Sequence, residues 1–381
     1  MLYPAIEPYA SGLLDVGHGH RVYWEQCGNP QGQPIVFLHG GPGGGCTPLS
    51  RRLFDPRRYR VVLFDQRGCG RSIPHARTEH NFCEDLVRDM EALRETLDIE
   101  RWQLFGGSWG TTLALAYTRH HQERVQGLVL RGVFGAQPHE LDWLYKPGGA
   151  SQIFPQAWHA FVTALGPLGS IDQQHLLVAY DQCLQGDDKA KAQAAAQAWC
   201  AWESAVSSIH TAPQSSAAQR AAAPDPHHSL AMARISANML LRDPWLGVSG
   251  HVWPAQGLHG IPGTIVQGQW DVVTPMATAW QLHQSWPGST LCIVPEAGHA
   301  SSDPALRLAL IQALDDFPNS VIPAQAGIQV AISVQSERGL DSRLRGNDKG
   351  GGNDEGAGND EGAGNDKGGG NDGHREISTT S

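Results

Sequence analysis

Short apolar runs alternate with longer amphipathic stretches at both ends of the foldable part of the chain. The apolar runs cover residues 35–38, 61–64, 102–105 and 125–130, and later residues 264–267 and 290–294. Runs of this length that end in glycine-rich turns are typical of buried strands. Segments with a helical pattern separate these runs at 81–97, 111–120, 276–286 and 304–316. This alternation predicts an α/β fold, a mostly parallel sheet with helices on both faces.

The alternation stops between residues 134 and 249. Helical stretches rich in Ala, Gln and Trp dominate there, among them residues 189–207. The simplest organisation places this segment as a helical cap, inserted between two halves of one sheet domain at 1–133 and 250–317. Ligands of open α/β sheets bind beyond the carboxyl ends of the strands, so a cap at that edge would cover the site.

The last 64 residues have a different composition. All 12 Trp, 7 Tyr and 9 Phe lie at or before Phe317, and Asn-Asp pairs recur every six residues from Asn347 to Asn371. Such a segment buries too little apolar area to offset its ordering entropy, which predicts that residues 318–381 are a disordered low-complexity tail. A calcium-binding β-roll is the sharper alternative, but its repeats are nonapeptides with an inward apolar position, which this hexapeptide lacks.

Charge and composition limit which partners the protein can bind and in which cellular compartment it functions. The formal net charge is −10, and an acidic surface of this kind disfavours a nucleic-acid partner. No apolar run reaches the roughly 18–20 residues of a membrane span, and residues 1–12 lack the pattern of a signal peptide. The seven cysteines are scattered without a Cys-x-x-Cys pair, which favours reduced thiols and no zinc site. We therefore expect a cytoplasmic protein that does not associate with a membrane and that uses no metal or other cofactor.

Ser108 is the candidate nucleophile. It lies in Gly106-Gly-Ser-Trp-Gly110, between a predicted strand and a predicted helix. A nucleophile on such a tight turn is exposed above the sheet, and the flanking glycines remove side chains that would clash. The helix that follows also points its positive N-terminal end at the reacting atoms.

A serine hydroxyl needs a base, and that base needs a carboxylate to orient it. In α/β-hydrolases the three residues follow the chain order Ser, Asp or Glu, His. Asp271 follows the predicted strand 264–267, and His299 follows the predicted strand 290–294. Both residues are thus expected at the edge of the sheet that also presents Ser108. A turn aspartate and a surface histidine are the alternatives, but the ordered set favours catalysis.

Two backbone N–H groups are expected to stabilise the oxyanion of a tetrahedral intermediate. Trp109 follows the nucleophile, and Gly41 lies in the loop His39-Gly-Gly-Pro-Gly-Gly-Gly45. A glycine-rich loop could also bind phosphate, but no Lys-Ser/Thr pair of a P-loop and no Gly-x-Gly-x-x-Gly pattern follows.

Four motifs together resemble the prolyl aminopeptidase (proline iminopeptidase) family. They are His39-Gly-Gly-Pro-Gly43, Asp65-Gln-Arg-Gly-Cys-Gly-Arg-Ser72, Gly106-Gly-Ser-Trp-Gly110 and Gly149-Ala-Ser-Gln-Ile-Phe-Pro155. The resemblance covers most of residues 1–317 and none of the tail. It implies an α/β-hydrolase with a helical cap that releases N-terminal proline from peptides without a metal, with Ser108 as nucleophile, Asp271 as orienting acid and His299 as base.

The same resemblance implies a carboxylate in the cap that binds the substrate's ammonium group. Glu203, directly after Trp202, fits that position, with an exposed helix glutamate as the alternative. The family's second amine-binding glutamate falls where this chain has Ser236, so that carboxylate is missing. This departure bears on the choice of substrate and leaves the predicted catalytic centre unchanged.

The expected function is therefore a serine peptidase that removes N-terminal proline through an acyl-enzyme. An esterase or amidase on the same scaffold is the nearest alternative, and the serine at position 236 is its best support. Epoxide hydrolases and dehalogenases use an aspartate nucleophile, which Ser108 disfavours. A binding protein without catalysis would not need all three residues of the triad. The sequence leaves the oligomeric state and the physiological peptide open.

Overall fold

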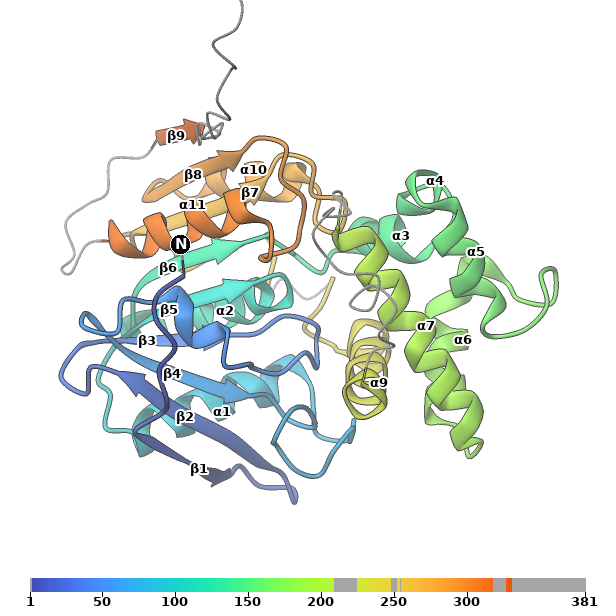
Figure 1. Ribbon diagram of the computed structural model, residues 1–381, viewed down its shortest axis with the longest axis horizontal. Coiled ribbons are helices and arrows are strands. Elements are labelled where there is room, and N and C mark those ends of the chain that lie inside the picture. Colours follow the sequence, from blue (N-terminus) through green and yellow to red (C-terminus); the bar gives the residue numbers. More distant parts are fainter. Residues whose placement is uncertain (1, 209–224, 248–251, 254, 318–326, 331–381) are drawn as a thin grey trace, which may run out of the picture. The chain divides into compact units, whose positions relative to one another are not determined.

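The computed structural model describes residues 2–208, 225–247, 252–253, 255–317 and 327–330 (Figure 1). The chain divides into two units, 1–334 and 335–381, and the described residues all belong to the first. The predicted tail, residues 318–381, thus lies outside the described residues except for 327–330.

One nine-stranded sheet forms the centre of the first unit. Its order is β1-β2-β4-β3-β5-β6-β7-β8-β9. The first two strands are antiparallel to their neighbours, and all other neighbours are parallel. The strands are β1 (Ala10–Asp15), β2 (Arg21–Gly28), β3 (Gln33–Leu38), β4 (Tyr59–Asp65), β5 (Trp102–Gly107), β6 (Val125–Arg131), β7 (Gly263–Gly268), β8 (Ser289–Val294) and β9 (Gly327–Val330).

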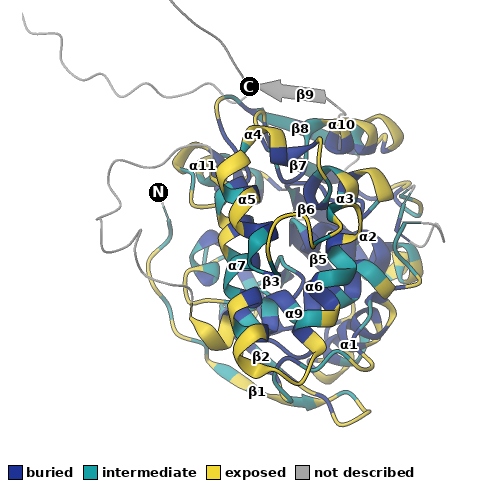
Figure 2. Ribbon diagram, turned by 90° about the vertical axis from the view of Figure 1, so that its right-hand side faces the viewer, coloured by how far each residue is buried: buried dark blue, intermediate teal, exposed yellow. Residues whose placement is uncertain are grey.

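Successive strand residues point to opposite faces of the sheet, and each face has its own hydrophobic core. In β3, Val36 and Leu38 join the core of one face, while Ile35 joins the core of the other. The first core includes residues of α1 (Cys83–Thr96), α2 (Trp109–His120) and α10 (Met276–Ser285), and the second includes residues of α11 (Pro304–Asp315). Figure 2 shows α11 on one side of the sheet and α1, α2 and α10 on the other.

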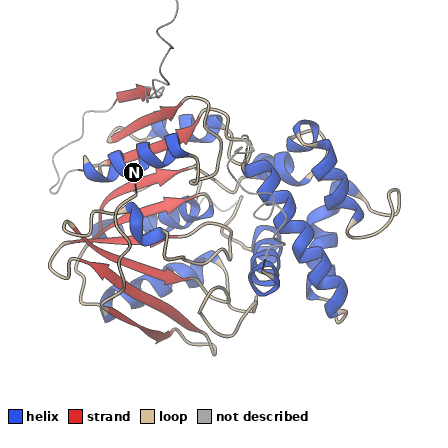
Figure 3. Ribbon diagram, viewed as in Figure 1, coloured by secondary structure: helices blue, strands red, loops and turns tan. Residues whose placement is uncertain are grey.

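The chain leaves the sheet after β6 and returns to it at β7. Between them, the described residues form helices and loops only, gathered beside the sheet (Figure 3). A third hydrophobic cluster, rich in aromatic residues such as Trp199 and Trp202, holds these helices together. The helices are α3 (Pro138–Tyr145), α4 (Ala150–Ile153), α5 (Pro155–Thr163), α6 (Leu176–Gln185), α7 (Lys189–Ser207) and α9 (Pro226–Arg242).

The structure confirms the predicted fold class and each of the six predicted strands, β3 to β8. The pattern missed β1 and β2, because β2 contains the buried polar pair Glu25 and Gln26 in place of an apolar run. The prediction of disorder for 318–381 was wrong for residues 327–330, which form β9 and pair in parallel with β8. Backbone hydrogen bonding to an existing sheet edge needs no apolar run of its own, so composition gave no sign of this strand.

Candidate active site

The candidate residues follow four strands that end at the same edge of the sheet. The loop with Gly41 follows β3, Ser108 follows β5, Asp271 follows β7 and His299 follows β8. These strands are parallel, so their carboxyl ends meet at the same edge.

Ser108 lies on a strained turn between β5 and α2. Its φ of 56° and ψ of −124° are rare for a residue with a side chain. A Cβ on Gly106 would lie 2.4 Å from Gly110 O, and one on Gly110 would lie 2.1 Å from Leu38 O. Glycine is therefore required on both sides of the nucleophile for the turn to pack this closely, as the motif predicted.

Asp271 and His299 are hydrogen-bonded to each other. His299 Nδ1 lies 2.8 Å from Asp271 Oδ2, and both side chains are buried. Thr274 donates to the same carboxylate through its N–H at 2.8 Å and its hydroxyl at 2.9 Å. Gln267, at the end of β7, donates to Asp271 Oδ2 from 3.2 Å and to the Thr274 carbonyl from 2.7 Å. These contacts fix the carboxylate and thereby the plane of the imidazole.

Arg131 is hydrogen-bonded to the other ring nitrogen of His299, Nε2. Its Nη1 lies 3.1 Å from His299 Nε2 and donates to His299 O at 3.0 Å. An arginine has only donors, so Nε2 accepts and the ring proton belongs on Nδ1, facing Asp271. Burial lowers the pKa of Arg131, and Asp271 opposes that effect. Within the described part of the chain the Ser108 hydroxyl forms no hydrogen bond, so the structure joins the acid to the base but not the base to the nucleophile.

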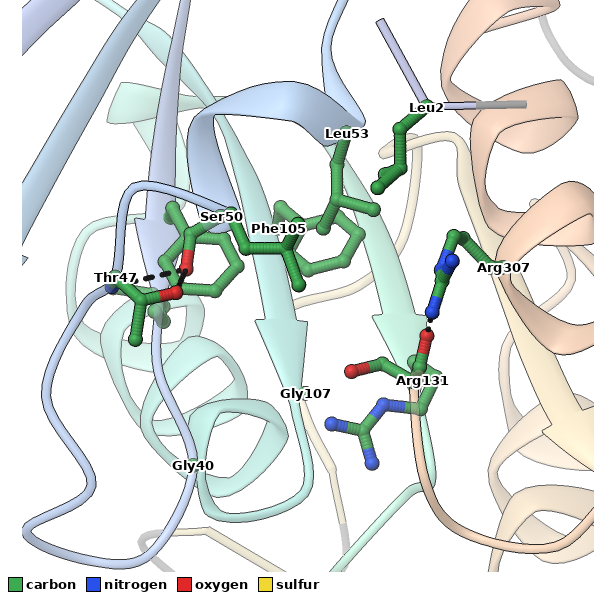
Figure 4. A pocket seen from close by; sticks show the side chains of 13 residues that line it. Leu2, Gly40, Thr47, Ser50, Leu53, Phe105, Gly107, Arg131 and Arg307 are labelled. Atoms are coloured by element: carbon green, nitrogen blue, oxygen red, sulfur yellow. Dashed lines mark hydrogen bonds between the residues drawn. The ribbon is translucent and has the colours of Figure 1, made fainter. Parts of the chain in front are cut away.

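A small cavity lies beside Arg131 on the α11 side of the sheet. It measures about 120 Å³, and Gly40, Gly107, Arg131 and Arg307 are among the residues that line it (Figure 4). A Cβ on Gly107 would lie 2.7 Å from Arg131 Nη2. The missing side chain of Gly107 thus provides the space that the guanidinium fills between this cavity and His299.

The two candidate oxyanion donors belong to segments that adjoin Ser108, one in sequence and one in space. The Trp109 N–H begins α2 and therefore has no acceptor within the helix. Gly41 has a φ of 124°, which favours glycine, and its loop passes so near that a Cβ on Gly40 would lie 3.4 Å from Ser108 Cβ. Among the described residues, neither N–H donates a hydrogen bond, so both remain available to a substrate.

Glu203 projects from α7 in the cap. The Tyr145 hydroxyl donates to Glu203 Oε1 at 2.6 Å. Burial raises the pKa of Glu203 to about 7, and the bond from Tyr145 partly offsets this rise. The last residue of the same helix, Ser207, accepts a bond from the N–H of Ala300 at 3.1 Å, directly after His299. Glu203 and Ser207 are four positions apart on one helix face, which places the carboxylate one turn from the loop with His299.

Ser236 does not face open space. Its side chain is 1% exposed, and its hydroxyl donates to the carbonyl of Pro42 at 2.8 Å. Ser236 therefore ties helix α9 to the loop that contains Gly41.

Comparison with known proteins shows the fold family and the closer family of this chain. Residues 33–305 match the model of the alpha/beta hydrolase fold family. A proline iminopeptidase of Xylella fastidiosa is 47% identical over 317 residues, which cover 83% of this chain and 99% of that protein. The chain belongs to the proline iminopeptidase family. A proline iminopeptidase of Arabidopsis thaliana is 46% identical over 82% of this chain and 80% of its own, and one of Neisseria gonorrhoeae is 43% identical over 83% and 98%.

Among solved structures, an alpha/beta fold family hydrolase of Bacillus anthracis has a TM-score of 0.50 at 17% identity, covering 81% of this chain and 99% of its own. At 17% identity, this structural similarity supports the α/β-hydrolase fold of this proline iminopeptidase family member, but no statement about its substrate. The described residues contain no helix long and apolar enough to cross a membrane. They also contain no group of three or more His, Cys, Asp or Glu side chains placed to hold a metal ion.

Sequence reasoning on this proline iminopeptidase family member missed Arg131, Gln267 and Tyr145. A signal existed for the first two, because each is a polar residue at the carboxyl end of an otherwise apolar strand. Such residues reach the edge of the sheet where ligands bind. Tyr145 had no comparable signal, since its partner Glu203 is 58 residues away on another cap helix.

Proposed function

We propose that the protein is a serine peptidase that releases N-terminal proline from peptides through an acyl-enzyme. Family membership over 99% of the length of a proline iminopeptidase carries this proposal. The bond between His299 and Asp271, and the strained turn at Ser108, supply the parts that such chemistry needs.

In the proposed reaction His299 takes the proton of Ser108 on Nε2. Arg131 Nη1 must first release that nitrogen, because one lone pair cannot accept both protons. The serine oxygen then attacks the carbonyl of the first residue, and the N–H groups of Gly41 and Trp109 stabilise the oxyanion. His299 gives the proton to the leaving amine as its bond to the carbonyl carbon breaks. It then takes a proton from water, which attacks the ester of Ser108; the ester bond breaks, proline leaves and Ser108 regains the proton.

Recognition of the substrate's free amine belongs to Glu203 in this proposal. A carboxylate near the reacting carbonyl selects peptides by their N-terminal ammonium group through a charge-assisted hydrogen bond. Tyr145 holds one carboxylate oxygen and leaves the other for the substrate. With Ser236 committed to Pro42, the described part of the cap offers no second carboxylate at that position.

The test compares hydrolysis of a chromogenic proline amide that has a free amine with the same amide blocked at the amine, and with a simple acetyl ester. The proposal predicts cleavage of the free-amine amide and its loss in Ser108→Ala. Rapid ester cleavage without amide cleavage would instead identify an esterase, the alternative that the serine at position 236 favours. Binding of prolyl compounds with no turnover of any substrate would identify a binding protein.

A further inference from the structure

The motif that begins at Asp65, the last residue of β4, has no part in the reaction described so far. We infer that its second residue, Gln66, is a positioning residue that aligns the two oxyanion donors, Gly41 and Trp109. The inference rests on the proposed function in one respect, the assignment of those two N–H groups to the oxyanion.

Gln66 forms three hydrogen bonds to the two segments that contain the donors. Its side chain donates to the carbonyl of His39 at 3.1 Å and accepts from Trp109 Nε1 at 3.0 Å. Its backbone N–H donates to His39 Nε2 at 3.0 Å. Gln66 is 2% exposed, and His39 and Trp109 are buried with it. Water cannot replace these contacts, so the geometry of both segments depends on this one residue, and two of the three bonds depend on its side chain.

The bond to Trp109 fixes the residue that follows the nucleophile. The indole is fully buried, and Trp109 is the first residue of α2. A side chain held at its far end restricts the rotation of its own backbone. The turn at Ser108 and helix α2 direct the Trp109 N–H, and the contact between Nε1 and Gln66 holds this residue in place.

The bonds to His39 fix the loop that contains Gly41. His39 is held at its ring and at its carbonyl, and its Nδ1 lies 2.9 Å from Gly40 O. The same Gly40 carbonyl accepts from the N–H of Gly44 at 3.1 Å. In a trans peptide the C=O and the next N–H point in opposite directions. With the Gly40 carbonyl turned to His39 and Gly44, the Gly41 N–H must point away from them and stays free for an oxyanion.

This arrangement makes a prediction about the transition state in particular. Displacement of a catalytic group by about 1 Å can cost about 100-fold in rate, and loss of one oxyanion donor costs about 100- to 1,000-fold in kcat. Gln66→Met keeps the length of the side chain and removes its donor and acceptor. We expect kcat for the free-amine proline amide to fall about 10- to 100-fold, with KM within about twofold, because the donors act on the oxyanion and not on the ground state.

The experiment pairs Gln66→Met with Gln26→Met as a matched control. Gln26 is a buried glutamine in β2 whose Oε1 accepts from Arg60 Nε at 2.7 Å, away from the site. The control should lower the melting temperature and leave kcat within about twofold. Each protein is also treated with an alkyl fluorophosphonate, whose phosphoryl oxygen requires the same two donors. Its rate of reaction with Ser108 should fall about 10- to 100-fold in Gln66→Met only.

A folded Gln66→Met protein with unchanged kcat and an unchanged phosphonylation rate would overturn the inference. Equal losses in both methionine variants would do the same. Should Gln66→Met not fold, Trp109→Phe removes the indole N–H together with the volume of its second ring and should slow phosphonylation. An unchanged rate there also counts against Gln66. The fluorophosphonate needs no proline, so a parent protein that reacts with it but releases no proline rejects the proposed function without touching this inference.

Discussion

In the proposed function, Glu203 gives substrate selection its own pH dependence. Its pKa is raised to about 7 by burial, so the carboxylate that binds an ammonium group forms only as the pH rises through about 7. Hydrolysis of free-amine substrates should therefore increase between about pH 6 and pH 8 relative to hydrolysis of a neutral ester. Glu203→Gln should abolish this relative increase and reduce cleavage of the free-amine amide more than that of the ester. Equal reductions for both substrates would remove Glu203 from amine recognition.

Tyr145 adjusts the ionisation of Glu203. Its hydroxyl donates to the carboxylate and lowers the pKa of Glu203, so Tyr145→Phe should raise that pKa further. The rise of free-amine hydrolysis should then move to higher pH, with the maximum rate reached once Glu203 is ionised. Tyr180→Phe is the matched control, because it removes a buried hydroxyl of the same cap cluster that donates to Phe161 O. A profile shifted equally in both variants would contradict a specific role for Tyr145.

Among the site residues, sequence order predicted the acid and the base, and the structure places them in contact. Chain order was informative because successive parallel strands end at one edge of the sheet. It could not predict that Arg131 would occupy His299 Nε2, since that contact depends on the space left by Gly107. The link from His299 to Ser108 remains a prediction.

Helix α9 joins the cap to the catalytic loop through Ser236. Its bond to the Pro42 carbonyl is buried, and such a bond contributes roughly 1 kcal/mol to stability. Ser236→Ala should lower the free energy of unfolding by about that amount and reduce kcat, because the loop with Gly41 loses a contact. Ser229→Ala on the same helix is the control, since the Ser229 hydroxyl is buried without a hydrogen-bond partner in the described structure. Denaturant titrations of the two variants with the same stability change would contradict this role for Ser236.

At the scale of elements, the apolar runs predicted β3 to β8 because those strands are covered on both faces and need few polar residues. The same reasoning fails for β2, where Glu25 is buried yet bonded to Arg51 and Arg71. Those partners lie 26 and 46 residues away, so nothing in the local pattern shows that the charge is neutralised. The periodicity of a sequence therefore does not reveal a polar residue that is buried because distant residues pair with its charge.

At the scale of the whole molecule, this chain is longer than the Xylella fastidiosa relative that it matches almost throughout. A match of 317 residues covers 99% of the Xylella fastidiosa protein and leaves 64 of the 381 residues of this chain without a counterpart there. Phe317 belongs to the core on the α11 side of the sheet and is buried against Gly127, where an added Cβ would lie 2.5 Å from its ring. Just before it, the Tyr59 hydroxyl donates to Leu314 O at 2.6 Å.

A chain that ends after Phe317 should therefore retain kcat/KM within about twofold of the full chain on the free-amine proline amide. Ending it after Val330 instead keeps β9 on the edge of β8. The shorter protein exposes the unpaired backbone groups of β8, so it should aggregate more readily at equal activity, as light scattering on heating can show. Removal of Phe317 as well should destabilise the fold, since it opens the core beneath Gly127. A soluble, folded protein that ends after Phe317 and is inactive would show that catalysis depends on the remaining 64 residues after all.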